Sequence, residues 1–233
     1  MTTLEQRLAD VRCRILQACQ AAGRDPACVG LLAVSKLQPP QAVRQAHKAG
    51  QQAFGENCVQ EALDKMAALA DLRGAIEWHL IGPLQSNKTR VVAEAFDWVH
   101  SVDRLKIAQR LSDQRPAQLP PLNVCLQVNI SGEASKSGLP PQEVEQVAAA
   151  VAALPRLRLR GLMSIPEPAQ GLLAQQAPHR ALRLLLQDLN QQGLALDTLS
   201  MGMSDDLEAA VAEGSTMVRV GTAIFGSRPQ KAA

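Results

Sequence analysis

With 233 residues and a formal net charge of +2, the chain is long enough for one large domain with a substantial core, and it lacks the broad basic surface of a nucleic-acid-binding protein. Its five cysteines are an odd number and form no CxxC pair, which argues against a disulfide framework and a zinc site and favours a reducing cytoplasm. No segment approaches the roughly 18–20 apolar residues that span a bilayer, so we expect no membrane partner.

Residues 1–23 have the apolar spacing of an amphipathic helix. One face of this helix collects Leu4, Leu8, Val11, Ile15, Ala18 and Ala22. Thr2 and Glu5 have the spacing of a capping box, and Gly23 stands where a helix would end. We therefore expect a helix packed on the rest of the chain, not a signal peptide, and a single domain over residues 1–233.

Short β-like runs then alternate with helical patterns along the chain. The eight runs cover residues 29–36, 52–57, 75–82, 96–102, 122–130, 157–165, 196–202 and 216–221. Helical spacing is found in residues 40–50, 59–72, 103–113, 141–154, 179–193 and 204–214, and we interpret 164–179 as an extended loop. The alternation predicts an α/β protein with a parallel (β/α)8 TIM barrel, although an open doubly wound sheet has the same pattern.

The predicted carboxyl ends of the strands are unusually polar. The residues there are Lys36, Glu56, Asn57, His79, Asn129, Met163, Ser164, Ser200, Met201, Arg219, Gly221 and Thr222. Because the active sites of such barrels lie at this end, we expect the chemistry of the protein there.

Lys36 ends the apolar run "LLAVSK" and has two interpretations. A lysine at a strand end can extend its charge to the rim while its methylenes pack on the barrel. A desolvated lysine can instead attack a carbonyl and form a Schiff base. A phosphate site at Gly221, Thr222 and Ser200 would favour a phosphorylated aldehyde, whereas turn formation and helix capping explain these residues equally well.

The order of several motifs carries more information than any one residue. They are "AVSK" at Lys36, "FGENCVQEA" from Phe54, "WHLIGPLQSNKTR" from Trp78, "VNISGEASKSG" from Val128, "GLMSIPEP" from Gly161 and "LSMGMSDDLEAAVAEGSTMVRVGTAIFG" from Leu199. Over nearly its whole length the chain resembles the YggS/PROSC family of pyridoxal 5′-phosphate (PLP) homeostasis proteins. The resemblance implies a barrel of the alanine racemase N-terminal type that binds PLP.

Position by position, the resemblance implies an aldimine at Lys36, with Arg219 against the pyridine nitrogen. It gives Ser200, Gly221 and Thr222 to the phosphate. It also implies that Asn57, His79 and Ser164 are pocket residues near the ring. The sequence departs from the family pattern at Leu37, Cys58 and Trp78, which concerns the pocket lining rather than the cofactor contacts.

Some of these assignments have structural alternatives. His79 on an apolar strand can be a core histidine paired with a neighbour. Arg219 can be an ion-pair partner, but as a permanent cation it would leave a pyridine nitrogen unprotonated and weaken the ring as an electron sink. Lys88, Arg90 and Lys136 are interpreted as solvated residues outside the site, and no metal site is expected.

An enzymatic alternative is an amino-acid racemase or another PLP enzyme of the same fold type. In the racemases that the chain resembles, the second base is a tyrosine from a second domain, but this sequence has no tyrosine and its end shortly after the eighth run leads us to expect no second domain. Cys58 or His79 would have to replace that base. A Schiff-base aldolase acting on a sugar phosphate is a further alternative.

We therefore expect a non-enzymatic carrier that holds PLP reversibly. The resemblance implies a role in keeping the free aldehyde low, in supplying apo-enzymes and in balancing amino-acid metabolism. We further expect a cytoplasmic monomer.

Overall fold

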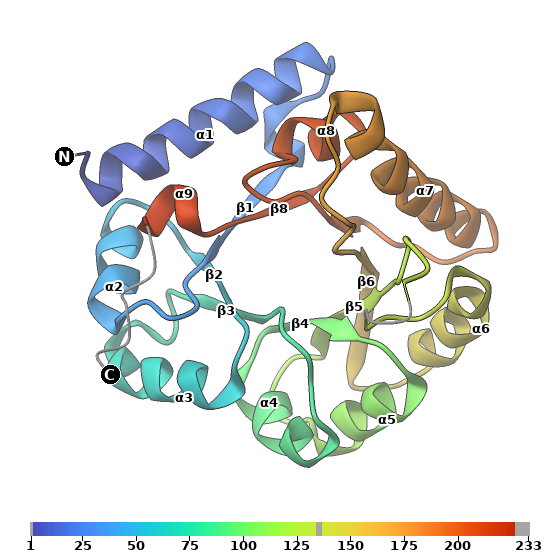
Figure 1. The fold of residues 1–233 in the computed structure, drawn as a ribbon. Coiled ribbons are helices and arrows are strands. Elements are labelled where there is room, and N and C mark those ends of the chain that lie inside the picture. Colours follow the sequence, from blue (N-terminus) through green and yellow to red (C-terminus); the bar gives the residue numbers. More distant parts are fainter. Residues whose placement is uncertain (1, 134–136, 227–233) are drawn as a thin grey trace.

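Eight parallel strands close into a barrel in the order in which they occur along the chain (Figure 1). The computed structural model describes residues 2–133 and 137–226. Its strands are β1 (Gly30–Val34), β2 (Ala53–Glu56), β3 (Glu77–Leu80), β4 (Trp98–Val102), β5 (Leu122–Gln127), β6 (Leu157–Met163), β7 (Thr198–Ser200) and β8 (Met217–Val220). Because β8 pairs with β1, the predicted barrel is confirmed and the open doubly wound sheet is excluded.

A ring of helices covers the outside of the barrel (Figure 1). The α-helices are α1 (Leu4–Ala21), α2 (Pro40–Lys48), α3 (Val59–Ala68), α4 (Thr89–Ala95), α5 (Leu105–Gln114), α6 (Pro141–Ala152), α7 (Leu172–Gln191), α8 (Leu207–Ala212) and α9 (Thr222–Phe225). Short 3₁₀ helices occur at Pro26–Cys28, Ala70–Leu72 and Ser86–Lys88. Among the described residues, no helix combines the length and the apolar character that crossing a membrane requires.

Helix α1 precedes the barrel and packs against α8 and α9. Its capping box is formed by Thr3 and Gln6, so the predicted pair of Thr2 and Glu5 is wrong by one residue. The Thr3 hydroxyl accepts from the Gln6 N–H and the Gln6 side chain accepts from the Thr3 N–H. This reciprocal pairing requires an extended residue at the cap, which Thr3 provides. The helix ends as predicted before Gly23, which has a positive φ of 63°.

Helix α7 overturns the prediction of an extended loop over residues 164–179, because it already begins at Leu172. Pro178 lies inside the helix and removes one backbone hydrogen bond. Buried side chains from His179 to Leu189 hold the helix against the barrel, so tertiary packing overrides the local effect of the proline.

Side chains along the strands alternate between two apolar layers. Outward residues such as Phe54, Trp78 and Val124 join the core between sheet and helices. Inside the barrel are two small clusters, which consist of Leu32, Val34 and Ile81 and of Trp98, Cys125 and Met163. Buried polar side chains also belong to the strands, among them His79, His100, Ser200 and Arg219. The interior of the barrel is therefore partly polar.

Candidate functional site

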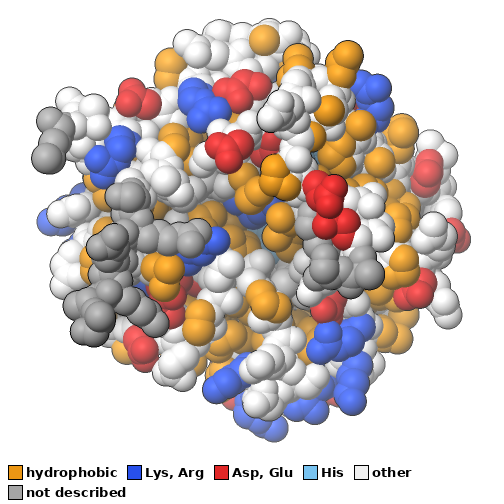
Figure 2. Space-filling model, viewed as in Figure 1, with side chains coloured by type: hydrophobic (Ala, Val, Ile, Leu, Met, Phe, Trp, Pro, Cys, Tyr) orange, Lys and Arg blue, Asp and Glu red, His pale blue; other side chains and the backbone are white. Residues whose placement is uncertain are grey.

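A pocket with a volume of about 430 Å³ lies at the carboxyl end of the barrel. It is lined by Val34, Lys36, Gln38, Asn57, Ile81, Ile165, Met203, Ser204, Asp205, Arg219, Gly221, Thr222, Phe225 and Gly226. Five of these residues were predicted as site residues: Lys36, Asn57, Arg219, Gly221 and Thr222. Figure 2 shows basic side chains at the hollow centre of this face, with hydrophobic side chains around it. The pocket thus combines cationic groups with an apolar rim.

Lys36 lies in the turn that follows β1 and is partly buried. The next residue, Leu37, has a φ of 61° and is the only non-glycine residue with a positive φ in the described ranges. This conformation costs roughly 1–2 kcal/mol for a residue with a side chain. The Leu37 N–H donates to Glu61 Oε1 over 2.5 Å, which ties the turn to α3.

A buried network of charged side chains on β2 and α3 holds the turn that contains Lys36. Lys65 Nζ on α3 donates to the Ser35 carbonyl (2.6 Å), to Glu56 Oε1 (2.7 Å) and to Glu61 Oε1 (2.6 Å). The Ser35 hydroxyl donates to the same Glu56 oxygen over 2.6 Å. Burial raises the pKa of Glu56 despite the nearby ammonium of Lys65. A group of polar side chains immediately behind Lys36 therefore fixes the backbone that carries it.

Gly221 and Thr222 connect β8 to the start of α9 at the wall of the pocket. A Cβ on Gly221 would lie 3.1 Å from the Val34 carbonyl oxygen, so glycine allows this turn to approach β1 closely. The first N–H groups of a helix have no intrahelical acceptor. Together with the Thr222 hydroxyl, they give this wall donors that suit an anion.

Arg219 reaches the pocket from β8 and is only 4% exposed. Its Nη1 donates to Ser200 Oγ and its Nη2 to the Ser164 carbonyl, both over 2.9 Å. Burial lowers the pKa of Arg219 to about 10, although the carboxylate of Asp206 opposes this shift. The guanidinium is therefore still charged at neutral pH and is held by two neutral oxygens.

Three predicted site residues do not line the pocket. Ser200 and Ser164 are fully buried beside Arg219, so that Ser200 touches the guanidinium through its hydroxyl and Ser164 through its carbonyl. His79 is fully buried in the barrel interior and is paired with two side chains, as the structural alternative for this residue describes. A direct contact between any of the three and a ligand stays a prediction.

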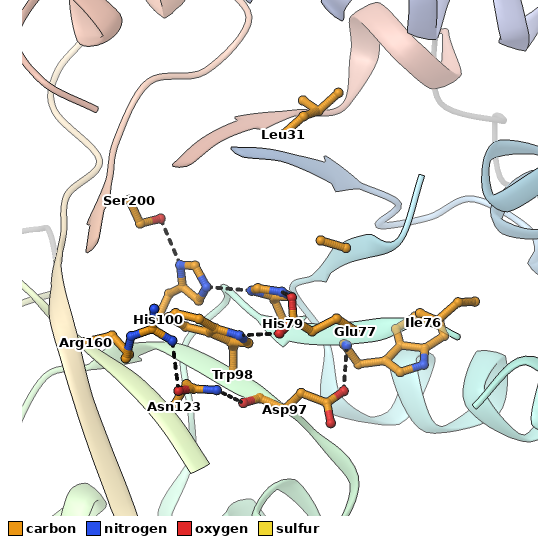
Figure 3. Close-up of polar contacts among 12 residues, drawn as sticks. Leu31, Ile76, Glu77, His79, Asp97, Trp98, His100, Asn123, Arg160 and Ser200 are labelled. Carbon is orange, nitrogen blue, oxygen red and sulfur yellow. Dashed lines mark hydrogen bonds and ion pairs between the residues drawn. The ribbon is translucent and has the colours of Figure 1, made fainter. Parts of the chain in front are cut away.

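His100 and Glu77 belong to the same group of polar side chains but were not predicted from the sequence. His100 Nδ1 lies 2.8 Å from Ser200 Oγ, and its Nε2 lies 2.9 Å from His79 Nδ1. On the other side, His79 Nε2 lies 3.1 Å from Glu77 Oε2 (Figure 3). A signal was available, because His100 follows Trp98 by two residues and therefore shares its inward face.

Two buried polar atoms near the pocket have no hydrogen-bond partner among the described residues. They are Asn57 Oδ1 and Ser164 Oγ. An unpaired buried polar atom costs about 1–3 kcal/mol, so such atoms call for an explanation. A polar ligand that donates to Asn57 Oδ1 would supply a partner, whereas the fit to an anion rests on Lys36, Arg219 and Thr222 in the same pocket.

Two other hollows lie at the amino end of the barrel, with volumes of about 430 Å³ and 770 Å³. The larger one contains Arg73 and Arg115, but Arg73 is paired with Asp97 and Arg115 donates to backbone carbonyls. Neither hollow contains a lysine beside an anion-binding turn. The carboxyl-end pocket remains the candidate site, although one of the two hollows has a larger volume.

The remaining sequence assignments concern residues outside the pocket. Lys88 and Arg90 are exposed near the start of α4, as expected of solvated residues. Lys136 lies outside the described residues. Cys58 is exposed, and all five cysteines are free thiols. The described residues contain no group of three or more acidic, histidine or cysteine side chains that could hold a metal ion.

Comparison with known proteins places this geometry in a family. The family described as alanine racemase, N-terminal domain, matches residues 8–229. A pyridoxal phosphate homeostasis protein from Pseudomonas aeruginosa is 66% identical over 228 residues, which cover 98% of this chain and 97% of the relative. The chain belongs to the family of pyridoxal phosphate homeostasis proteins. The homeostasis protein of Escherichia coli strain K12 is 55% identical, with 98% of each chain covered, and the family resemblance of the motifs is confirmed.

Solved structures of similar proteins have the same barrel. PipY of Synechococcus elongatus, in a structure without PLP, has a TM-score of 0.86 and 41% identity, covering 96% of this chain and 100% of PipY. PipY with PLP bound has a TM-score of 0.84 and 40% identity, with the same coverage. Alanine racemase from Corynebacterium glutamicum, at 20% identity and a TM-score of 0.69 over 93% of this chain and 60% of the racemase, shares the fold alone.

Proposed function

We propose that this protein binds PLP in the carboxyl-end pocket and holds it reversibly as part of PLP homeostasis. The observation that carries the proposal is that one pocket collects Lys36, Arg219, Gly221 and Thr222. A family member that is 40% identical has been solved with PLP bound. PLP offers an aldehyde, a phosphate and a pyridine nitrogen, and the pocket has a group suited to each.

Lys36 is the residue that we assign to the aldehyde. When bound, PLP would supply an aldehyde, and the Lys36 amine would hold it through a reversible bond formed with loss of one water. Hydrolysis, or exchange with another amine, reverses the bond and releases the guest. The anchored turn of Ser35 and Leu37 keeps the amine at the pocket wall, which supports a defined attachment point.

We assign the phosphate to Gly221 and Thr222, and the pyridine nitrogen to Arg219. The donors at the start of α9 suit a phosphate, and the family resemblance adds Ser200 to the same group. A guanidinium with a pKa near 10 donates a hydrogen bond without giving up its proton at neutral pH. It therefore leaves the pyridine nitrogen unprotonated, which limits the carbanion chemistry that PLP supplies when bound.

The same geometry supports a carrier over an amino-acid racemase. The chain has no tyrosine. Of the two substitute bases, His79 is buried and paired inside the barrel, and Cys58 is exposed and is not among the lining residues of the described pocket. A bound amino acid would thus meet neither of these two substitute bases in the pocket, and we propose that it is not turned over.

The cellular role that we propose follows the family name. The protein keeps free PLP low and supports its supply to apo-enzymes and balanced amino-acid metabolism. Five free thiols support a reducing compartment such as the cytoplasm. We propose that the chain acts as a monomer, because the barrel already closes on itself through β8 and β1.

The decisive test is the absorbance of the purified protein with PLP. We expect a yellow species that borohydride fixes on Lys36, as located by peptide mass spectrometry. The Lys36→Ala variant should lose that band and retain weaker, noncovalent binding, whereas the control Lys88→Ala, at an exposed lysine, should behave like the wild type. An unchanged spectrum in Lys36→Ala would show that another lysine is the attachment point.

Incubation with a panel of amino acids separates carrier from enzyme. We expect no chiral inversion and no decarboxylation above the rate of free PLP. Turnover at enzymatic rates would contradict the carrier assignment. A colourless protein that borohydride links to a sugar phosphate instead would support a Schiff-base aldolase.

A further inference from the structure

A chain of polar side chains runs through the barrel from its amino end to the pocket, and Figure 3 shows its part from Glu77 to Ser200. It begins at Glu77, the first residue of β3, whose side chain is 47% exposed and lines both amino-end hollows. It continues through His79, His100 and Ser200, and it ends at Arg219, which lines the pocket at the other end. Each step is a hydrogen bond of 2.8–3.1 Å, so the direction of every donor depends on its neighbours.

The chain has a fixed end at Glu77. The hydrogen bond with His79 lowers the pKa of Glu77, so its side chain is a carboxylate at neutral pH and only accepts hydrogen bonds. Trp98 Nε1, which can only donate, occupies Oε1 over 2.7 Å. The other oxygen, Oε2, faces His79 Nε2, which must therefore carry a proton.

The proton on His79 Nε2 determines where the protons lie on the two histidine rings. If His79 carries only this proton on Nε2, its Nδ1 is an acceptor, and this atom faces His100 Nε2. Burial holds the pKa of His100 well below its usual range, so this ring is neutral and has a single N–H. That N–H is used toward His79, which leaves His100 Nδ1 as an acceptor for the Ser200 hydroxyl.

Ser200 then has its only proton directed at His100 and a lone pair directed at Arg219 Nη1. We propose that Glu77 fixes the Nε2–H tautomer of both His79 and His100, so that Ser200 accepts from Arg219. In contrast to the phosphate contact that the family resemblance implies for it, Ser200 then does not donate to an anion in the pocket. Glu77, the two histidines and Ser200 are positioning residues for the guanidinium. That the guanidinium meets a pyridine nitrogen rests on the proposed function, whereas the tautomers do not.

Nitrogen-15 NMR of the imidazole rings tests the tautomers without any ligand. The chain has four histidines, which makes assignment practical. We expect pyrrole-type Nε2 and pyridine-type Nδ1 signals for both His79 and His100 in the wild type. Glu77→Gln keeps the size of the side chain but has only one acceptor oxygen for two donors. If that oxygen keeps Trp98, the amide N–H faces His79 and both tautomers reverse.

The matched control is Glu145→Gln, at an exposed carboxylate on α6. It removes the same charge and should leave all ring signals in place. An Nδ1–H tautomer at His100 or a doubly protonated His79 in the wild-type protein at neutral pH would overturn the proposal. So would a Glu77→Gln variant that is folded, by its backbone amide spectrum, keeps the hydrogen-bonded signal of the Trp98 indole N–H and has unchanged tautomers.

Ligand affinity gives a second, independent measurement. Pyridoxal is PLP without its phosphate, so the ratio of the two affinities reports phosphate contacts. We expect Ser200→Ala to weaken both ligands about tenfold and to leave the ratio unchanged, because a hydrogen bond to a charged group is lost beside the ring. Thr222→Ala should weaken PLP alone and reduce the ratio about tenfold.

A Ser200→Ala variant that weakens PLP and spares pyridoxal would contradict the proposal, since the hydroxyl would then serve the phosphate. Failure of the wild-type protein to bind either ligand would contradict the proposed function instead. In that case the ring tautomers would still decide the role of Glu77.

Discussion

Gly82, directly after Ile81 at the pocket, determines where Asn57 can lie. A Cβ at Gly82 would overlap the backbone carbonyl of Asn57. A flexible side chain could move away from this Cβ, but the backbone at the end of β2 cannot. We expect Gly82→Ala to cost about 1–3 kcal/mol of unfolding free energy. We also expect weaker PLP binding, because Asn57 lines the pocket.

Urea unfolding followed by circular dichroism checks the stability, and a PLP titration checks the binding. Gly74→Ala is the matched control, since a Cβ there meets no atom within 4 Å and the residue does not have a positive φ. It should stay within about 0.5 kcal/mol of the wild type. Equal effects of both substitutions would show that the contact with Asn57 is unimportant.

At the scale of elements, Asp206 joins helix α7 to the loop that lines the pocket between β7 and α8. One of its carboxylate oxygens is 3.0 Å from His179 Nε2 on α7, and the other accepts from the Met203 N–H over 2.6 Å. Burial alone would raise the pKa of Asp206, but these hydrogen bonds outweigh burial and lower it. The carboxylate thus holds Met203 at the pocket rim.

The lowered pKa of Asp206 predicts a pH dependence with a definite sign. Since its folded-state pKa lies below its unfolded value, the stabilisation is complete above that unfolded value, about 4, and is lost as the pH falls through the folded value. Asp206→Asn should therefore cost about 1–3 kcal/mol near neutral pH and progressively less in acid.

Urea unfolding at several pH values measures this difference. Asp205→Asn, at the exposed neighbouring carboxylate, is the control and should change stability little at any pH. A deficit of Asp206→Asn that stays constant into strong acid would mean that the charge of the carboxylate does not matter.

At the scale of the whole molecule, α1 covers the region where the barrel closes. It packs against α8 and α9, and Arg7 Nε donates to the Ile224 carbonyl over 2.7 Å. Leu8 is 1% exposed in this contact. If residues 1–233 form one domain, as the sequence predicts, the helix and the barrel should unfold together.

Leu8→Ala should then lower the unfolding free energy of the entire protein by about 2–5 kcal/mol in a single transition. Leu16→Ala lies on the exposed side of the same helix, at 41% exposure, and should cost less than about 1 kcal/mol. Circular dichroism and tryptophan fluorescence should report the same midpoint in urea. Two separate transitions would show that α1 is an independent unit.

Local pattern predicted the order of strands and helices because period-2 and period-3.6 apolar spacing follow directly from burial on one face. It failed where a local signal competed with packing, as at Pro178, which lies inside α7. It also misplaced the capping box by one residue. Thr2 with Glu5 and Thr3 with Gln6 both have the three-residue spacing of this motif, so the spacing alone does not distinguish them.

The site was predictable where a residue lies at or just after a strand end, as Lys36, Arg219 and Thr222 do. The partnership of His100 with Ser200 joins residues separated by 100 positions and depends on closure of the barrel. The same holds for Lys65, whose contacts with Glu56 and the Ser35 carbonyl arise only when α3 packs on the strands. Such pairings depend on the tertiary structure and cannot be predicted from the spacing of residues along the chain.

The setting of Trp98 gives the barrel its own optical reporter. Its ring stacks on His79 with a centroid separation of 5.3 Å, and its indole N–H is held by Glu77. The protein has two tryptophans and no tyrosine, and the other tryptophan, Trp78, lies in the outer core. Replacing Trp78 with phenylalanine would leave Trp98 as the only source of tryptophan fluorescence. The intensity of this fluorescence would then report both the binding of PLP and changes in the hydrogen-bonded chain that Glu77 and His79 belong to.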